Sequence, residues 1–306
     1  MENAKYKPVY LETYKSGELD ERIEKLMAIL NECKLCPRAC GVNRTEGEKG
    51  YCKADNQLMV SGVHPHFGEE DVLVGTHGSG TIFLTHCNLR CIYCQNYDIS
   101  HLGLGHRVTE EELALSMLRL QKLGCHNINF VTPTHFTPQI LKAVKIAVEN
   151  GLHLPIVYNC SGYESTNTIA LLDGIVDIYM PDIKYSDEGT AKRYSNAPDY
   201  FMVCKEAVKE MHRQVGDLTV DERGIAVRGL LIRHLVLPNG LAGSAAVFKF
   251  IATELSKESY VNIMRQYRPM YKAYDYKELN RGIKMSEYRE ALDSAKEWGL
   301  HRGFEY

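Results

Sequence analysis

Short apolar runs and amphipathic stretches alternate regularly from about residue 80 to the end of the chain. Several of the apolar runs are nearly continuous, as expected for parallel strands that are covered on both faces. The stretches between them have helical spacing. The alternation predicts six strand–helix units of an α/β fold, which form either a partial barrel or a doubly wound sheet. The predicted strands are GTIFLTH, NINFVT, LPIVYN, IVDIYMPDIKY, RGLLIRHLVLP and YVNIMRQY.

Two of the predicted helices begin with recognisable capping residues. Thr109 is followed three residues later by Glu112, which is the pattern of a capping box. Thr137 precedes Pro138, which predicts Thr137 as the N-cap and the proline as the first helical residue. These signals place helices between consecutive strands and therefore favour a parallel sheet.

Polar clusters follow the predicted strands. Cys87 follows the first strand, and TPTH, NCSGYE, PDIK, HLVLPNG and RQYRP lie around the ends of the next five. The carboxyl ends of parallel strands share one face of an α/β fold, and ligands bind at that face. Because folding does not require such clusters, the sequence predicts a functional site there.

Residues 1–79 lack this alternation and are predicted to form an accessory region, with the barrel in residues 80–306. The stretch GELDERIEKLMAILNE indicates an amphipathic helix that leads into a group of cysteines. The stretch VHPHFGEEDVLVGTHGSG indicates a glycine-rich connection or a hairpin. Its side chains of metal-ligand type are loosely spaced, which predicts a solvated loop that is free to cover the active face. They are His64, His66, Glu69 and Glu70.

The composition is that of a globular protein, with 306 residues of which 44% are hydrophobic and 25% charged. The formal net charge is -3 without a long basic tract, so we expect no nucleic-acid partner. The sequence has neither a signal-peptide core nor an apolar run of membrane-spanning length, so we expect no membrane association. The ten cysteines are therefore expected to be reduced thiols in the cytoplasm, which serve metal or redox chemistry.

Three cysteines crowd into the stretch THCNLRCIYCQNYD, at Cys87, Cys91 and Cys94. A structural zinc site or a ferredoxin cluster takes four protein ligands. Buried small residues or an incomplete zinc site are the simpler interpretations, but this spacing on a loop after a strand rarely results from packing. The more specific interpretation is a [4Fe–4S] cluster that is held by three thiolates and leaves one iron open.

The C-x3-C-x2-C loop, with Tyr93 before its last cysteine, resembles the defining motif of the radical S-adenosylmethionine (SAM) superfamily. From about residue 33 onward the chain looks like an uncharacterised family of homologues of pyruvate formate-lyase activating enzymes. The resemblance implies a partial (β/α)6 TIM-like barrel. It also implies that SAM chelates the open iron. One electron then splits SAM into methionine and a 5′-deoxyadenosyl radical, which abstracts hydrogen from a substrate.

The same resemblance implies cofactor-binding roles for residues at the strand ends. Asp182 and Lys184 are similar to the Asp-x-Lys pair on the SAM side of the activating enzymes, with a loop salt bridge as the alternative. Activating enzymes also carry a Gly-Gly-Glu-Pro segment after the second strand, which receives the SAM amino group. Here that segment reads TPTH, so groups of Thr132, Thr134 and His135 have to replace the glutamate.

Further candidates follow the third strand and lie on the fifth. Asn159 and Ser161 are placed to meet the ribose or the carboxylate of SAM, although a simple turn uses the same residue types. Arg233 and His234 point to opposite faces of their strand, because side chains alternate along a strand. His234 occupies a position where activating enzymes place a SAM-contacting side chain, and a core histidine is the alternative.

A second group of cysteines lies nearer the N-terminus, at Cys33, Cys36, Cys40 and Cys52. It has the four ligands that a closed site requires. Its C-x2-C-x3-C-x11-C spacing is not that of bacterial ferredoxins. Structural zinc and a second iron–sulfur cluster are both consistent with it.

Together these features predict a radical SAM enzyme with an unidentified substrate, reduced by a donor such as flavodoxin or ferredoxin. The substrate is either a glycyl-radical protein, which would make the chain an activase, or a small molecule or peptide. A non-catalytic iron–sulfur electron carrier or metal-binding module is the alternative. That alternative predicts a fully ligated cluster, with Cys125 or Cys160 as the fourth ligand and no response to SAM.

Overall fold

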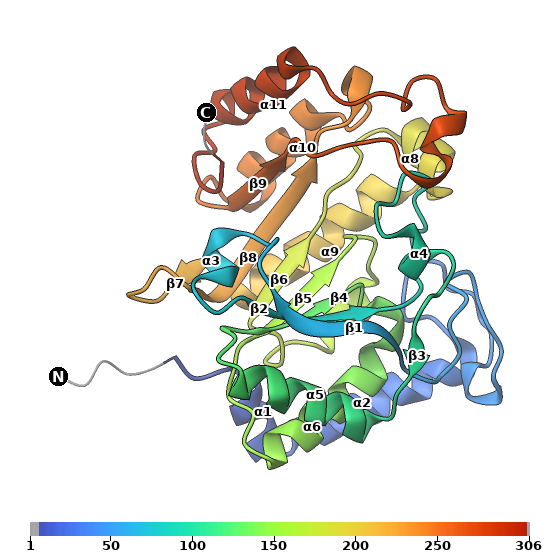
Figure 1. Cartoon of the computed structure of the whole chain (residues 1–306), viewed down its shortest axis with the longest axis vertical. Helices are drawn as coiled ribbons and strands as arrows, with labels where there is room; N and C mark the ends of the chain where they lie inside the picture. Colours follow the sequence, from blue (N-terminus) through green and yellow to red (C-terminus); the bar gives the residue numbers. More distant parts are fainter. Residues whose placement is uncertain (1–5, 305–306) are drawn as a thin grey trace.

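The computed structural model describes residues 6–304, and its described strands form one mixed sheet that does not close (Figure 1). The strand order is β3-β1-β2-β4-β5-β6-β8-β7, and β9 pairs with β8. The strands β2, β4, β5, β6, β8 and β9 pair in parallel, and they are the strands that the alternation predicted. The strands are β1 (Met59–His66), β2 (Ser79–Leu84), β3 (His106–Arg107), β4 (Ile128–Val131), β5 (Ile156–Cys160), β6 (Ile178–Pro181), β7 (Thr219–Val220), β8 (Ala226–Leu235) and β9 (Tyr260–Met264).

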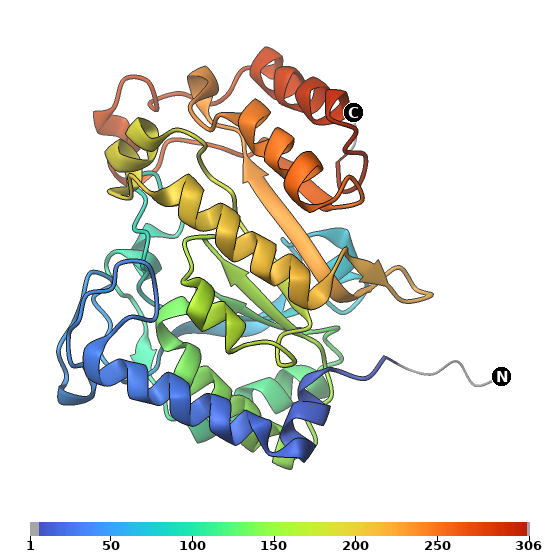
Figure 2. The same cartoon turned by 180° about the vertical axis from the view of Figure 1, so that it is seen from behind.

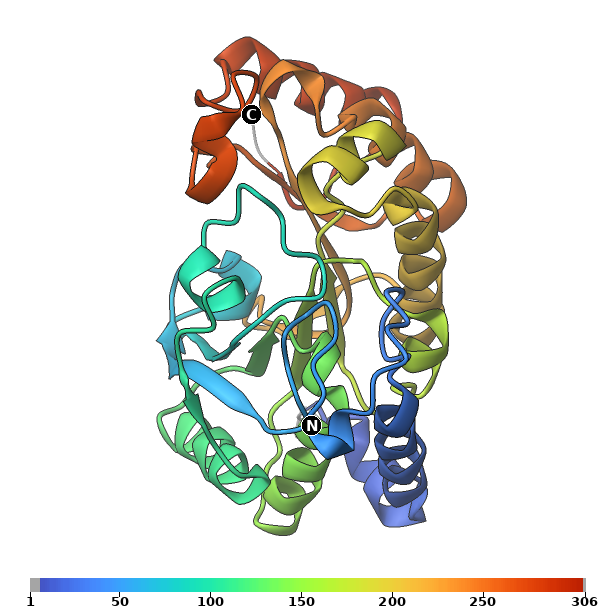
Figure 3. The same cartoon turned by 90° about the vertical axis from the view of Figure 1, so that its right-hand side faces the viewer.

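Helices cover the outer side of this sheet, and Figure 2 shows α9 lying across it. Viewed from the side onto which the strands point, the helices form an arc and one side of the fold stays open (Figure 3). The fold is therefore a partial, TIM-like barrel. The helices are α1 (Tyr10–Ser16), α2 (Glu18–Ala28), α3 (Asp71–Val74), α4 (Tyr97–Ser100), α5 (Glu110–Lys122), α6 (Thr137–Glu149), α7 (Thr166–Ala170), α8 (Glu188–Ser195), α9 (Tyr200–Val215), α10 (Ser244–Phe250) and α11 (Met285–Glu297).

The central strands have the burial that their sequences predicted. Every residue of β5 and of β6 is buried. Such strands carry apolar side chains on both faces because helices or other segments cover each face. No helix within residues 6–304 has both the length and the apolar character needed to cross a membrane.

One of the two predicted helix caps is confirmed. The Thr109 side chain accepts from the backbone N–H of Glu112, and the glutamate side chain accepts from the N–H of Thr109. The other prediction is wrong, because the N-cap of α6 is Phe136 and Thr137 is already helical. A short 3₁₀ turn precedes α6, so the chain begins to wind before Thr137, whose hydroxyl donates to the carbonyl of Thr134 at 3.1 Å instead.

The N-terminal region is built onto the barrel. The predicted amphipathic helix is α2, which buries Leu19, Ile23 and Leu26 and packs on α6. The connection that follows the cysteines contains β1, which pairs antiparallel with β2 and extends the sheet by an edge. Residues from both regions belong to the same hydrophobic core.

Candidate active site

A cavity of about 400 Å³ lies at the carboxyl ends of the parallel strands. Its walls come from the loop after β2 and from the ends of β4, β5, β6, β8 and β9. This is the face at which the polar clusters predicted a site. The predicted residues that line the cavity are Cys87, Cys91, Tyr93, Cys94, Thr132, Asn159, Ser161, Asp182 and Lys184.

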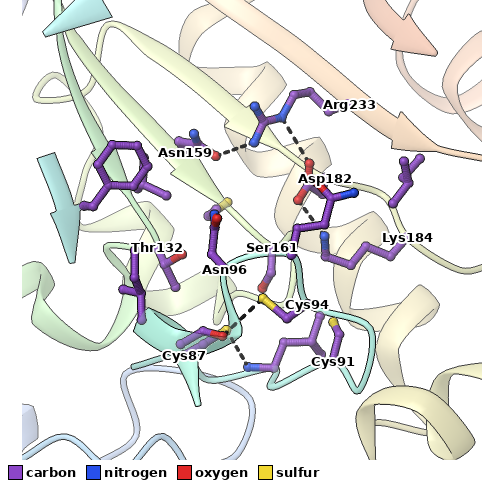
Figure 4. A pocket seen from close by; sticks show the side chains of 18 of the residues that line it. Cys87, Cys91, Cys94, Asn96, Thr132, Asn159, Ser161, Asp182, Lys184 and Arg233 are labelled. Atoms are coloured by element: carbon purple, nitrogen blue, oxygen red, sulfur yellow. Dashed lines mark hydrogen bonds and ion pairs between the residues drawn. The ribbon is translucent and has the colours of Figure 1, made fainter. Parts of the chain in front are cut away.

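The three cysteines of the loop after β2 face this cavity together (Figure 4). Cys91 is buried, and Cys87 and Cys94 are half-buried. The backbone N–H of Leu89 donates to the Cys87 sulfur at 3.3 Å, and the Ser100 hydroxyl donates to the Cys94 sulfur at 3.1 Å. Hydrogen bonds of this kind stabilise thiolates and tune iron–sulfur clusters.

The loop that carries the cysteines is held from outside by neighbouring segments. The backbone N–H of Ile92 donates to the carbonyl of Tyr194 at 2.9 Å, and the N–H of Lys272 donates to the carbonyl of Ile92 at 3.0 Å. Tyr93 is buried, and its ring packs edge-on against Tyr185 and Tyr267. The aromatic residue of the motif therefore also anchors the loop in the core.

A chain of alternating charges crosses the cavity opposite the cysteines (Figure 4). The Lys184 ammonium lies 2.6 Å from one carboxylate oxygen of Asp182, and the Arg233 guanidinium donates to the other at 3.1 Å. Arg233 also donates to Glu69 and to the side-chain carbonyl of Asn159, at 2.8 Å each. This network is more than the surface salt bridge that was the alternative for Asp182 and Lys184, because its members are mostly buried.

Electrostatics keeps these groups ionised. Burial alone would raise the pKa of Asp182, but Lys184 and Arg233 outweigh it and the pKa is lowered. Burial likewise opposes the charged form of Lys184, but Asp182 and the nearby thiols Cys91 and Cys94 raise its pKa. The ammonium of Lys184 is thus a fixed positive charge close to the cysteine sulfurs.

The loops that carry Asp182 and Ser161 are tied together by Tyr200 from α9. Its hydroxyl lies 2.8 and 2.9 Å from the backbone carbonyls of Ser161 and Asp182, which share its single proton, and it accepts from the N–H of Lys184 at 3.0 Å. Gly162 has a φ of 74°, and a Cβ there would collide with the Asp182 carbonyl. The glycine is therefore required for the close approach of these two strand ends.

Two features of the cavity wall, an unpaired hydroxyl and an unusual backbone conformation, are typical of ligand-binding sites. The hydroxyl of Ser161 is buried and makes no hydrogen bond within residues 6–304. Thr132 has a φ of 59°, an unusual backbone conformation for a β-branched residue. Such features concentrate where a ligand binds.

The structure does not bring Thr134, His135 or His234 to the cavity. The Thr134 hydroxyl donates to Glu164 at 2.7 Å, and the His135 imidazole contacts the Thr85 carbonyl at 2.7 Å. His234 is fully buried and bonds to the Ile183 carbonyl and the Ser244 hydroxyl, at 2.7 and 2.9 Å. The predicted cofactor contact of His234 thus has no support, and the core-histidine alternative describes it.

Arg233 and Glu69 are two charged residues of the cavity that the sequence interpretation did not select as cofactor contacts. Because side chains alternate along β8, Arg233 points into the cavity and His234 points away from it. The sequence interpretation had selected His234 and not Arg233 as the cofactor contact. Glu69 was expected in a solvated loop, but its side chain is only 8% exposed and pairs with Arg233. Glu70 is also buried and accepts from Asn262 at 2.7 Å. The expectation of a solvated loop is wrong for both acids.

The N-terminal cysteines come close to one another in space. Burial raises the pKa of Cys52, and the neighbouring Cys33 and Cys40 raise it further. Burial, Cys52 and Cys33 act in the same direction on the pKa of Cys36. Within residues 6–304, no three cysteine, histidine or acidic side chains converge on a point where one metal ion could be held. Each thiolate of a [4Fe–4S] cluster binds a different iron, so cluster ligands stand further apart than the ligands of a single ion.

The donor set of the cavity fits an iron–sulfur cluster with a ligand beside it. Burial, reinforced by the adjacent Cys91, raises the pKa of the Cys87 thiol to about 12, so the thiol ionises only next to strong positive charge. A metal cluster supplies such charge and binds thiolates. The remaining wall offers a lysine, an arginine and a free hydroxyl to a polar ligand.

A partial α/β barrel with three cysteines on the loop after its first parallel strand defines a class of iron–sulfur proteins with an incomplete protein ligand set. The family model of the Radical SAM superfamily matches residues 81–222. The uncharacterized protein MJ0674 of Methanocaldococcus jannaschii is 33% identical over 299 residues, which cover 95% of this chain and 82% of that protein. The chain belongs to the radical SAM superfamily. Iron–sulfur character and SAM binding follow from this membership.

Two further proteins are similar to parts of the chain. The pyruvate formate-lyase-activating enzyme of Clostridium pasteurianum is 30% identical over 112 residues, 35% of this chain and 46% of that enzyme. The solved structure of native anSMEcpe with bound AdoMet aligns with 69% of this chain and 57% of that chain, at a TM-score of 0.47 and 13% sequence identity.

Behind the cavity wall, the buried carboxyl of Glu164 is expected to make the free energy of unfolding depend on pH. Burial raises the pKa of this carboxyl from 4.5 to about 8, against hydrogen bonds from Thr134 and Tyr158. Between these two values the folded chain keeps a proton that the unfolded chain has lost, so stability falls as the pH rises through this window. The shift corresponds to roughly 5 kcal/mol.

We expect Glu164→Gln to flatten this pH dependence, because the amide does not ionise. Urea unfolding of the wild type and the variant at pH 5 and pH 8 measures the effect. Glu297→Gln, an exposed change on α11, is the control and should leave the wild-type slope in place. A variant with the same slope as the wild type would show that Glu164 is not protonated in the folded chain.

Proposed function

We propose that this chain cleaves SAM reductively at a cluster on Cys87, Cys91 and Cys94 and uses the resulting radical to abstract hydrogen from a substrate. The observation that carries this proposal is the common cavity of three thiols and the Lys184–Asp182–Arg233 network. An electron carrier needs no such polar wall opposite its cluster. Membership of the radical SAM superfamily supports the same chemistry.

The side chains of the cavity have distinct roles in this proposal. The cluster, when bound, supplies the electron that splits SAM into methionine and a 5′-deoxyadenosyl radical. Lys184 offers a compact cation to the SAM carboxylate. Ser161 and the backbone at Thr132 offer hydrogen bonds to its polar groups. Arg233 keeps Asp182 oriented and ionised, since it donates to the carboxylate from the side opposite Lys184.

A radical SAM enzyme also requires a reductant and a substrate. We propose a donor of the flavodoxin or ferredoxin type. The activating enzymes place a glutamate after the second parallel strand, but here Thr134 and His135 are occupied by Glu164 and the Thr85 carbonyl. We therefore propose that the chain modifies a small molecule or peptide directly, in preference to a role as an activase. The partial similarity to a pyruvate formate-lyase-activating enzyme is the argument for the activase.

We also propose that residues 1–79 are an accessory region whose four cysteines bind zinc or a second iron–sulfur cluster. The mutual proximity of Cys33, Cys36, Cys40 and Cys52 supports a thiolate-ligated site. Because no three such side chains within residues 6–304 converge on one point, the cluster is favoured over zinc. Elemental analysis of the anaerobically purified chain distinguishes the two, because zinc adds one zinc per chain and a second cluster adds iron and sulfide. A chain with neither would contradict the assignment.

The experiment that tests the proposed function uses the full chain. It is reconstituted anaerobically and reduced with dithionite, and its EPR spectrum is recorded with and without SAM. We expect SAM to change the spectrum and 5′-deoxyadenosine to form. A spectrum indifferent to SAM, together with no product, would favour the electron carrier.

A further inference from the structure

Arg38 connects the two cysteine loops of this chain. It lies between Cys36 and Cys40, and its side chain reaches the loop after β2. Its Nε donates to the carbonyl of Asn88 at 3.1 Å, and one Nη lies 3.5 Å from the carbonyl of Leu89. Asn88 and Leu89 lie between Cys87 and Cys91, so one guanidinium bonds the backbone that carries the first two cysteines of the candidate active site.

The same guanidinium bonds a third segment. Its remaining N–H groups donate to the carbonyl of Ser195 at 2.9 Å and to the carbonyl of Asn196, at the end of α8. None of the ion pairs within residues 6–304 includes Arg38. All of its described hydrogen bonds go to backbone carbonyls, so its role there is to join segments and not to neutralise an acid.

Two aromatic rings fix the position of this guanidinium. It lies 3.8 Å from the ring centre of Tyr51 and 5.0 Å from that of Tyr163. Tyr51 precedes Cys52, the last cysteine of the N-terminal group. Tyr163 follows β5, and its carbonyl accepts from the buried Asn88 side chain at 2.6 Å. Each ring thus links Arg38 to one of the two cysteine loops.

Arginine suits this position because its planar group presents several donors in a fixed fork. The backbone from Cys87 to Cys91 belongs to no strand, and Arg90 has a left-handed φ of 57°. The backbone carbonyls of this loop therefore have no hydrogen-bond partners from a neighbouring strand. A lysine has a point charge and cannot span carbonyls of three segments at once.

The N-terminal cysteine loop is itself held in a defined shape. The N–H of Cys33 donates to the Val42 carbonyl at 2.9 Å, and the N–H of Tyr51 donates to the Cys40 sulfur at 3.3 Å. Further along, the buried Arg44 donates to the carbonyl of His135 at 2.6 Å. Arg38 and Arg44 thus fasten the cysteine segment to the active face at two points.

We propose that Arg38 is a positioning residue, which the N-terminal cysteine loop holds in place so that it fixes the backbone between Cys87 and Cys91. This inference rests on the proposed function in one respect, the cluster at Cys87, Cys91 and Cys94. The N-terminal cysteines then serve the geometry of the active site.

The first test is hydrogen–deuterium exchange on the full, anaerobically purified chain. In Arg38→Ala we expect the backbone amides of residues 88–91 to exchange about 10- to 100-fold faster, because the loop loses its charge-assisted hydrogen bonds to the guanidinium. Arg38→Lys should not restore protection. Arg22→Ala is the matched control, since Arg22 also donates to a carbonyl, that of Ala170 at 3.0 Å, and lines no part of the cavity. Unchanged exchange in Arg38→Ala would overturn the proposal.

The second test reads the active site by EPR. Arg38→Ala should keep the iron content of the wild type but show an altered reduced-cluster spectrum and about 10- to 100-fold weaker SAM binding.

These tests separate the two proposals. If the wild-type spectrum ignores SAM, the proposed function fails, while the exchange of residues 88–91 still reports on Arg38. If the wild type responds to SAM and Arg38→Ala responds equally, the positioning role fails and the proposed function stands.

Discussion

Replacing Cys91 with alanine is expected to abolish SAM cleavage. Cys91 is the buried, central thiol of the loop after β2, and its removal leaves two thiols for a cluster that needs three. We expect 5′-deoxyadenosine formation to fall by more than about 100-fold, beyond the usual cost of losing a group next to a metal site. The measurement is product quantification under dithionite reduction, with iron and sulfide determined on the same sample.

The matched control for this change is Cys125→Ala. Cys125 is also buried, but it precedes β4 at the other end of the strand and lines no part of the cavity. It should keep wild-type iron content and product formation. If Cys125 is a fourth cluster ligand, as the electron-carrier interpretation allows, Cys125→Ala should instead lose iron. Equal activity of Cys91→Ala and the wild type would exclude the proposed cluster ligands.

Replacing Arg233 with methionine is expected to destabilise the fold strongly. The change leaves Asp182 with Lys184 alone and Glu69 with an amide donor, Asn129, as its remaining bonded partner. Removing one member of a buried charge network costs about 3–5 kcal/mol, because the opposite charges stay buried without compensation. Urea unfolding at neutral pH under reducing conditions measures this loss.

Two comparisons make the Arg233 prediction specific. Arg223→Met removes an exposed partner of Asp221 and should cost no more than about 1 kcal/mol. Glu69→Gln combined with Arg233→Met should recover part of the loss, since one uncompensated charge is then gone. Similar stability of Arg233→Met and Arg223→Met would show that the network does not hold the cavity wall.

Some features of the site were predicted from local sequence because short-range physics decides them. The apolar runs of β5 and β6 predict buried parallel strands, and the Thr109 capping box predicts the start of α5. Since parallel strands end on one face, the cysteine loop and the segments around Asn159 and Asp182 had to lie together. Their convergence on one cavity required no knowledge of side-chain packing.

Other features were decided by tertiary packing. Thr134 and Thr132 are the same residue type in one short polar segment, yet Thr134 is fully buried and its hydroxyl donates to Glu164 behind the cavity wall. Thr137 reads as a helix cap, yet a preceding 3₁₀ turn moves the cap to Phe136. In both cases the threonine hydroxyl bonds to a group that the sequence pattern did not indicate. For Thr134 this is a distant acid, and for Thr137 it is the carbonyl of the preceding turn.

The amino-acid sequence was enough to predict the alternation of parallel strands and helices, the cysteine motif and the face on which the site is built. Three-dimensional packing was needed to show that Arg233 and not His234 enters the cavity, that Glu69 joins it from the N-terminal region, and that Arg38 reaches the cysteine loop. The physical reason is that strand period and helix caps depend on neighbours along the chain. The pairing of buried charges and carbonyls depends on groups that only folding brings together.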